Sequence, residues 1–386
     1  MKRDQLPTRH SAAIDGLRPQ RVALLAVLLA ALVGGAHAVP AAQAVAYVTN
    51  ERDGVDVVDL ATLTVQRRIA VGGAGPRGLG VTADGRYLLT ANKLTGDVSV
   101  LDTAGGTVVR RIPIGMNPEF IRIGGNFAYV TYEPGGSDNP AARRPGKDPE
   151  AAASGTTAAS AGADHRADDK NAGGDSNARL AVIDLSTWTV TGSIRSGHET
   201  EGVEFSPDGR HLIVTNEGDN TVSIYDRRTG APVRTVDTSA YGSRPRGIKA
   251  MPDGKGYIVT LESSDKFLVL DADYNPLRTF ATRTGPYGIA FDPDGKRLFI
   301  AASRASVLQV FDAGSYAPLG EIAVGKRCWH FAFTPDGSKI LAACGRSDAV
   351  YVVDARDFKT LKVLDGAEGP WGIVTYPKAS GSLDAR

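Results

Sequence analysis

Seven residues that could bind a ligand recur at one position of a repeated connector, where Pro-x-Gly or a variant of it precedes a short apolar run. The central residues are two arginines, two glutamates and three aromatics, namely Arg77, Glu119, Glu201, Arg246, Tyr287, Trp329 and Trp371. Charged and aromatic side chains around one opening suit a ring-shaped or amphipathic ligand, or a partner's loop. We expect these seven and His330 to form a binding site without a catalytic or metal-binding residue. The alternative is a ring of ion pairs that only closes a channel.

The two cysteines of the chain, Cys328 and Cys344, stand on either side of a predicted turn at Asp336. Counting outward from that turn places them opposite each other, so a cross-strand disulfide is one interpretation in an oxidising compartment. Two alternatives remain open. The cysteines could be buried free thiols, or they could form a soft-metal site with His330.

The seven connector residues can converge only on a scaffold that brings distant segments to one axis. A repeat along the chain predicts such a scaffold. An aspartate closes a short apolar run seven times, with gaps of 43, 82, 42, 45, 41 and 42 residues, at Asp59, Asp102, Asp184, Asp226, Asp271, Asp312 and Asp354. A period of about 40 residues built from short strands is typical of a β-propeller. Four strands, a to d, fit each unit, and a turn such as Pro207-Asp-Gly209 joins strands a and b.

The two ends of the repeat complement each other. Residues 46–50, 55–59 and 65–71 read as strands b, c and d without a strand a, and residues 371–376 read as a lone strand a. Joining them closes the ring and removes two exposed sheet edges. The sequence therefore predicts an all-β, seven-bladed propeller of four-stranded blades over residues 39–377, followed by a flexible tail at 378–386.

The doubled gap coincides with residues 133–179, which contain no Val, Ile, Leu, Phe, Tyr, Trp, Met or Cys. Such a segment has too little apolar surface to offset the entropy of ordering. We interpret it as a disordered, low-complexity insertion in the b–c loop of one blade. It is either a tolerated insertion or a lid over the face that carries the connectors.

The N-terminus has the pattern of an export signal. Basic residues precede the apolar run of residues 22–33, and Ala36-His-Ala38 follows it. We expect a cleaved signal peptide at 1–38, a periplasmic location and no membrane span in the mature chain; an uncleaved N-terminal anchor is the alternative. Removing residues 1–38 takes away five basic and two acidic side chains, which leaves a formal charge of −2. That balance argues against nucleic-acid binding.

Tyr47-Val-Thr-Asn50 is the sequence that names the YVTN-repeat propellers, and residues 45–377 resemble that YncE-like family throughout. The connectors resemble more closely those of exported YVTN propellers associated with PQQ-dependent alcohol catabolism. They run Pro76-Arg77, Pro118-Glu119, Glu201-Gly202, Pro245-Arg246, Pro286-Tyr-Gly288, Arg327-Cys-Trp329 and Pro370-Trp-Gly372. The insertion and the cysteine pair depart from that pattern. The resemblance implies an accessory, non-catalytic periplasmic protein.

Three functions follow as hypotheses. The first is a monomeric periplasmic binding or scaffold propeller, without a cofactor, that serves PQQ-dependent (quinoprotein) alcohol oxidation. Its partner would be a quinoprotein dehydrogenase or a cytochrome c, or it would hold a small ligand. The second is a lactonase-like hydrolase that uses Glu119, Glu201 or His330 with a metal. The third is a nucleic-acid-binding YVTN propeller.

Overall fold

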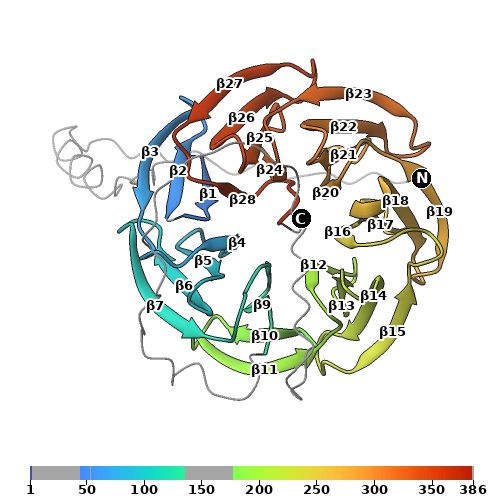
Figure 1. The fold of residues 1–386 in the computed structure, drawn as a ribbon, viewed down its shortest axis with the longest axis horizontal. Coiled ribbons are helices and arrows are strands. Elements are labelled where there is room, and N and C mark those ends of the chain that lie inside the picture. The colour runs from blue at the N-terminus through green and yellow to red at the C-terminus, as the bar shows by residue number, and fades with distance from the viewer. Residues whose placement is uncertain (2–43, 53, 135–176, 385–386) are drawn as a thin grey trace, which may run out of the picture. The chain divides into compact units, whose positions relative to one another are not determined.

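The computed structural model describes residues 1, 44–52, 54–134 and 177–384. Within the unit Gln43–Arg386, seven four-stranded antiparallel sheets form a ring (Figure 1). The only helix among the described residues is the short 3-10 turn η2 (Glu262–Ser264). The predicted all-β, seven-bladed propeller is thereby confirmed.

We number the blades from the one that contains the first strand. Blade 1 has the order β28-β1-β2-β3, and blades 2 to 7 take the remaining strands four at a time in chain order. The strands are β1 (Val45–Asn50), β2 (Val55–Asp59), β3 (Thr64–Ile69), β4 (Pro76–Val81), β5 (Tyr87–Asn92), β6 (Asp97–Asp102), β7 (Thr107–Pro113), β8 (Ile121–Gly124), β9 (Phe127–Tyr132), β10 (Arg179–Asp184), β11 (Thr189–Arg195), β12 (Thr200–Phe205), β13 (His211–Asn216), β14 (Thr221–Asp226), β15 (Pro232–Asp237), β16 (Pro245–Ala250), β17 (Gly256–Leu261), β18 (Lys266–Asp271), β19 (Pro276–Ala281), β20 (Pro286–Phe291), β21 (Arg297–Ala302), β22 (Val307–Asp312), β23 (Pro318–Ala323), β24 (Cys328–Phe333), β25 (Lys339–Cys344), β26 (Ala349–Asp354), β27 (Thr360–Asp365) and β28 (Pro370–Tyr376).

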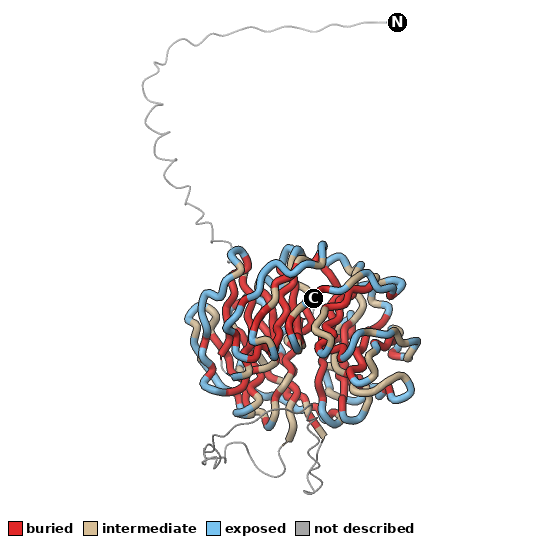
Figure 2. Tube along the Cα trace, turned by 45° about the horizontal axis from the view of Figure 1, so that its top comes forward, coloured by how far each residue is buried: buried red, intermediate tan, exposed pale blue. Residues whose placement is uncertain are grey.

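The ring closes as the sequence predicts. Strand β28, from the C-terminal end, pairs antiparallel with β1, in a register that sets Val45 opposite Tyr376 and Tyr47 opposite Val374. The outermost strand is the most exposed in each blade, and Figure 2 shows exposed residues along the outside of the ring. In blade 1, β1 is buried throughout, whereas the outermost strand β3 is exposed except at Ile69. The apolar core therefore lies between neighbouring blades, where their sheet faces pack together.

Glycine and threonine set how closely the innermost strands approach each other. A Cβ on Gly288 would lie 2.5 Å from the carbonyl oxygen of Trp329 in the next blade, and one on Gly372 would lie 2.7 Å from that of Arg77. The Gly of Pro-x-Gly is thus required by close backbone contact. The hydroxyl of Thr260 also donates to the carbonyl of Tyr287 across a blade boundary, at 2.8 Å. These contacts fix the backbone of the residue x.

Two predicted segments fall largely outside the described residues. They are the signal peptide at 1–38 and most of the insertion at 133–179, of which 135–176 are not described. On either side of the insertion, β9 and β10 pair with Tyr132 opposite Arg179, so the insertion does join strands b and c of blade 3. No helix in the described part of the chain is long and apolar enough to cross a membrane.

The prediction of a flexible tail is wrong for residues 378–384. This segment enters the central channel of the propeller, where Figure 1 marks the C-terminus, and Leu383 is 1% exposed there. The Lys249 ammonium donates to the carbonyls of Gly381 and Asp384 at 2.8 and 2.7 Å, and Arg122 donates to that of Leu383. Buried cations on two blades thus hold a segment whose composition alone gave no reason to expect order.

Candidate functional site

All seven predicted connector residues line one cavity of about 280 Å³ at the end of the channel where the d–a connectors lie. We call this cavity the mouth. Its described lining also includes Asn117, Glu133, Glu199, Glu217, Glu262, Arg244 and Arg327, so six glutamates and four arginines face it. The structure thus brings together residues from all seven d–a connectors and from further loop positions.

His330 does not belong to the mouth. It is 2% exposed and lies one layer deeper, beside an enclosed cavity of about 10 Å³ that Glu201, Tyr287 and Ser382 also line. Its Nδ1 lies 3.0 Å from the Ser382 hydroxyl, whereas its Nε2 has no hydrogen-bond partner among the described residues. Burial lowers the pKa of His330 to about 3, with the cations Lys249 and Arg122 adding to the effect. The imidazole is therefore neutral at physiological pH.

The sequence analysis missed a second set of mouth residues, which stand directly before the Pro-x-Gly connector or its variant. In every blade this residue has a positive φ between 49° and 71°, at Gly75, Asn117, Glu199, Arg244, Gly285, Arg327 and Gly369. The four that are not glycine are the four that line the mouth. Such a conformation costs a non-glycine residue about 1–3 kcal/mol and clusters at functional sites. Glycine would adopt this backbone conformation without strain, yet these four positions carry polar or charged side chains that line the mouth.

The residue after strand b supplies the third set. The backbone N–H of Glu217 donates to the carbonyl of Glu199 at 2.8 Å, and that of Glu262 donates to the carbonyl of Arg244 at 2.9 Å. These hydrogen bonds tie each b–c loop to its connector, so their side chains share one rim. The sequence showed Glu217 and Glu262 in the b–c loops, but gave no reason to separate them from turn residues.

One side of the mouth is rich in guanidinium groups. Four of them, from Arg244, Arg246, Arg304 and Arg327, lie 2.7 to 3.7 Å from the Glu262 carboxylate. Glu217 pairs with two of these arginines as well. Burial alone would raise the pKa of Glu262, but the guanidiniums hold it below its usual value. Two carboxylates thus face four cations, and we call this side the basic arc.

The adjoining side is acidic, and the Arg246–Glu201 ion pair joins the two sides. Blades 3 and 4 contribute Glu119, Glu133, Glu199 and Glu201. Glu119 pairs with Arg77 and lies 3.7 Å from the Lys93 ammonium. No ion pair to Glu133 or Glu199 is found within the described part of the chain. We call these four glutamates and Asn117 the acidic arc.

The carboxyl groups of Glu119 and Glu201 influence each other's protonation within this arc. Burial raises the pKa of Glu201 to about 8, and the like charge of Glu119 adds to the rise although Arg246 opposes it. The Arg77 guanidinium overcomes the effect of burial on Glu119 and keeps its pKa below the usual value. At neutral pH the pair therefore holds one proton, on Glu201.

Each arc contains one buried polar atom without a hydrogen-bond partner among the described residues. On the acidic arc it is an acceptor, Oδ1 of Asn117, and on the basic arc it is a donor, Nε of Arg244, which lies 3.7 Å from the Glu262 carboxylate, beyond hydrogen-bond distance. A buried polar atom left unpaired costs about 1–3 kcal/mol. Asn117 thus lacks a donor and Arg244 lacks a close acceptor.

The aromatic members of the ring differ in burial. Tyr287 and Trp371 are 6% and 2% exposed, and Trp329 is half-buried. The Tyr287 hydroxyl lies 3.3 Å from the Glu201 carboxyl, and Arg77 stacks 5.9 Å from the Trp371 ring. Trp329 therefore offers the aromatic surface that a ligand can reach, while the other two support the charged residues.

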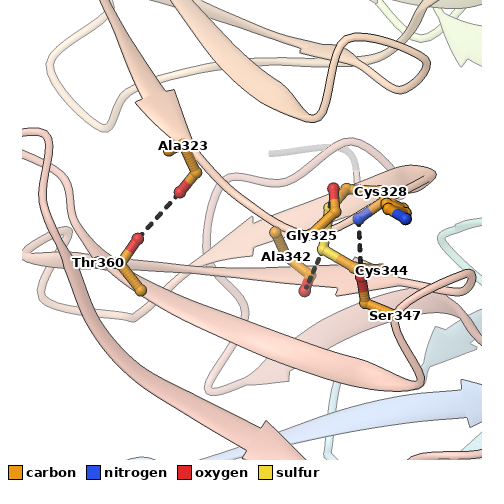
Figure 3. Close-up of a disulfide and its surroundings, with 8 residues drawn as sticks. Ala323, Gly325, Cys328, Ala342, Cys344, Ser347 and Thr360 are labelled. Carbon is orange, nitrogen blue, oxygen red and sulfur yellow. Dashed lines mark hydrogen bonds between the residues drawn. A yellow bond between two sulfur atoms is a disulfide. The ribbon is translucent and has the colours of Figure 1, made fainter.

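Cys328 and Cys344 form a disulfide between β24 and β25, where the two residues are opposite partners in the register (Figure 3). Both cysteines are 1% exposed or less, and no group of metal-ligating side chains occurs among the described residues. The disulfide fastens the start of the strand that carries Trp329 to the strand beside it. The disulfide therefore has a structural role, which is to support the mouth.

Comparisons with known proteins give the fold and a partial family match. Residues 173–313 match the model of the cytochrome D1 heme domain, and a comparison with curated proteins finds no match. The periplasmic gluconolactonase PpgL of Pseudomonas aeruginosa is 18% identical, with a TM-score of 0.63 over 86% of this chain and 99% of that chain. Kuenenia stuttgartiensis hydrazine synthase is 21% identical, with 0.60 over 80% and 95%. The dihydro-heme d1 dehydrogenase NirN, in complex with DHE, is 16% identical, with 0.59 over 85% and 74%.

The described mouth does not fit a haem. Haem iron takes His, Cys, Met or Tyr as its protein ligand. The described lining has no His, Cys or Met, and the Tyr287 hydroxyl is engaged by Glu201 and Arg246. The family match therefore supports the blade architecture, and the described residues give no support for haem chemistry.

Proposed function

We propose that this protein is an exported binding propeller whose mouth holds a small organic acid that also carries hydroxyl or amino groups. The observation that carries the proposal is the uneven distribution of charge around the mouth. A carboxylate would lie at the basic arc, near Arg327 and Arg244, where four guanidiniums share Glu217 and Glu262 and one of the four, Arg246, also pairs with Glu201. Donor groups of the same ligand would lie at the acidic arc, near Asn117.

The size of the mouth restricts the ligand. A volume of about 280 Å³ lies at the lower end of the range for ligand pockets, about 300–1,000 Å³. A hydroxy acid or amino acid of about six carbons fits, with an apolar face against Trp329. The acidic arc repels phosphate-rich polymers, which leaves the nucleic-acid hypothesis without support.

A periplasmic location is part of the proposal. It is supported by the signal-peptide pattern at 1–38 and by fold similarity to a periplasmic gluconolactonase. The more specific link to a quinoprotein dehydrogenase or a cytochrome c stays a prediction from the YVTN resemblance. A quinoprotein gene beside this one, and impaired growth on an alcohol after deletion, would support it; normal growth and quinoprotein activity would end it.

The experiment that tests the proposal is a thermal-shift screen of the purified protein against hydroxy acids, amino acids and the corresponding neutral polyols. We expect acids with donor groups to raise the melting temperature and polyols to have little effect. Arg327→Gln should abolish the shift. Arg356→Gln, which changes an exposed arginine after Asp354 on the opposite face, should leave it intact. Equal shifts with acids and polyols would overturn the proposal.

The carboxyl pair favours one second candidate, hydrolysis of a lactone. A carboxylic acid and a carboxylate that share a proton can supply an acid and a base to the same reaction. Glu201 would protonate the leaving oxygen of a cyclic ester while Glu119 accepts a proton from the attacking water. A pH-stat assay with a panel of lactones decides this candidate. Turnover that Glu201→Gln abolishes supports it, and no turnover with any lactone rejects it.

A further inference from the structure

The turns between strands a and b interlock around the face opposite the mouth. A Cβ on Gly295 would lie 2.9 Å from Pro252 of the preceding turn, and one on Gly337 would lie 2.7 Å from Pro293. Gly254, Gly295 and Gly337 of the Pro-Asp-Gly turns therefore each pack on the proline of the turn before them. This contact closes the surface between neighbouring blades.

Blade 3 breaks the interlock because its a–b turn is shorter. Six residues separate Phe205 from its partner Leu212 in blade 4, whereas four separate Ile123 from its partner Ala128 in blade 3. The short turn has no proline, and a Cβ on Gly125 would meet nothing within 4 Å. The result is an open cleft of about 890 Å³ between blades 3 and 4. We call it the turn cleft.

An arginine takes the place of the missing turn contact. The Arg227 guanidinium lies 4.3 Å from the centre of the Phe205 ring and 5.5 Å from that of Tyr129. It donates to the Tyr129 hydroxyl at 3.1 Å and to the Gly124 carbonyl at 2.5 Å. Its contacts are aromatic and neutral, so no carboxylate within hydrogen-bond distance neutralises this cation among the described residues.

The rest of the turn cleft is cationic and partly apolar. Arg210 and Arg228 stand beside Arg227, and Phe127 is 37% exposed at the rim. Asp226 is the only carboxylate in the described lining, and it accepts hydrogen bonds from the backbone N–H and the hydroxyl of Thr229 at 2.8 and 2.7 Å. Three guanidiniums thus face one lining carboxylate that already has partners, and Arg210 has a second carboxylate, Asp208, at 4.0 Å.

We propose that the turn cleft is a second binding site, which takes a small aromatic carboxylate. The aromatic ring would lie against Phe127 and the carboxylate would pair with Arg210 and Arg228. Guanidinium groups bind carboxylates through paired hydrogen bonds and stack on flat rings, which suits a ligand that is both anionic and aromatic. The site is independent of the mouth, which lies at the other end of the strands a.

The test uses 2-naphthoate as the probe, and saturation-transfer NMR on the purified protein measures its binding. We expect 2-naphthoate to bind, and 2-naphthalenemethanol and 2-naphthylmethylamine, which lack the carboxylate, to bind at least tenfold more weakly. The double variant Arg210→Gln/Arg228→Gln should weaken 2-naphthoate at least tenfold. Arg356→Gln is the matched control, because Arg356 follows Asp354 as Arg228 follows Asp226, in the corresponding turn of blade 7.

A second variant tests the origin of the cleft. Replacing residues 124–127 with the six-residue sequence of 206–211, Ser-Pro-Asp-Gly-Arg-His, lengthens the turn of blade 3 to that of its neighbours. Closing the cleft in this way should abolish 2-naphthoate binding, whereas the mouth variant Arg327→Gln should leave it unchanged. Undiminished binding to the double variant, or equal binding of all three naphthyl compounds, would overturn the proposal, as would no binding of 2-naphthoate. Loss of binding only in Arg327→Gln would assign the probe to the mouth and also overturn it.

Discussion

The hydroxyl of Thr49 donates a hydrogen bond of 2.5 Å to the backbone carbonyl of Arg77 in the next blade. It also accepts one from the N–H of Gly372 at 3.0 Å. Thr49 is the threonine of the YVTN sequence, and Arg77 and Gly372 belong to two of the connectors. The repeated sequence word is therefore the part of the scaffold that fixes the backbone of the mouth.

Thr49→Val should lower the free energy of unfolding by about 1–3 kcal/mol, because it leaves the carbonyl of Arg77 and the N–H of Gly372 buried and without this partner. Urea unfolding followed by fluorescence measures the change. Thr187→Val, at an exposed threonine that bonds only to Thr189, is the control and should change stability by less than about 0.5 kcal/mol. Equal effects of the two variants would contradict this role of Thr49.

Regular spacing in the sequence predicted those mouth residues that recur at the same position of each connector. Pro-x-Gly marks the start of each strand a, and the pleat of one strand repeats in every blade, so the seven residues x had to converge. Asn117, Glu199, Arg244 and Arg327 escaped notice because their common property is a positive φ. Backbone dihedrals of non-glycine residues are not visible in residue types.

Other features depended on contacts between distant segments. Residues 378–384 contain one large apolar residue, Leu383, and their order comes from Lys249 and Arg122 on other blades. His330 stands next to Trp329 in sequence, yet its neighbour lines the mouth while it points one layer deeper. Adjacent residues of a strand face opposite ways, and the bulge between Cys328 and His330 hides from the sequence which one reaches the mouth.

Glu201 should make the protein less stable as the pH rises from about 4.5 to about 8. Its pKa is raised in the folded state, to about 8, so the folded protein binds more protons than the unfolded chain in this range. Glu201→Gln, which mimics the protonated carboxyl, should remove this slope and be more stable than the wild type at pH 8 by more than about 1 kcal/mol. Urea unfolding at pH 5 to 9 measures both.

Glu119→Gln is the matched control for this prediction. Glu119 is the charged member of the pair and neutralises Arg77, so its loss should destabilise the protein at neutral pH. It also removes the like charge that helps to raise the pKa of Glu201, so the slope should end at a lower pH. If stability instead rises with pH in the wild type and not in Glu201→Gln, the assignment of the proton is wrong.

The disulfide should contribute about 3 kcal/mol to the free energy of unfolding, since Cys328 and Cys344 are 16 residues apart. The double variant Cys328→Ala/Cys344→Ala should lose about that amount in urea. Because both sulfurs are buried, dithiothreitol should reduce the disulfide in the unfolded state and leave the folded protein intact. Two free thiols in the native protein by thiol titration would contradict the disulfide.

Deleting residues 379–386 should lower the free energy of unfolding by more than about 2 kcal/mol. The deletion removes the buried Leu383 and leaves the Lys249 ammonium without the carbonyls of Gly381 and Asp384. Deleting only residues 385–386 is the control and should have little effect. If both truncated proteins unfold at the same urea concentration as the full chain, the tail does not stabilise the channel.

The most direct test of the mouth compares gluconate with sorbitol by isothermal titration calorimetry. The two share a six-carbon polyhydroxyl chain and differ in the carboxylate. The separation of basic and acidic arcs predicts that gluconate binds at least tenfold more tightly than sorbitol, and that Arg327→Gln removes this preference while Arg356→Gln keeps it. Equal affinity for the two compounds, or a preference for gluconate that survives Arg327→Gln, would contradict the account.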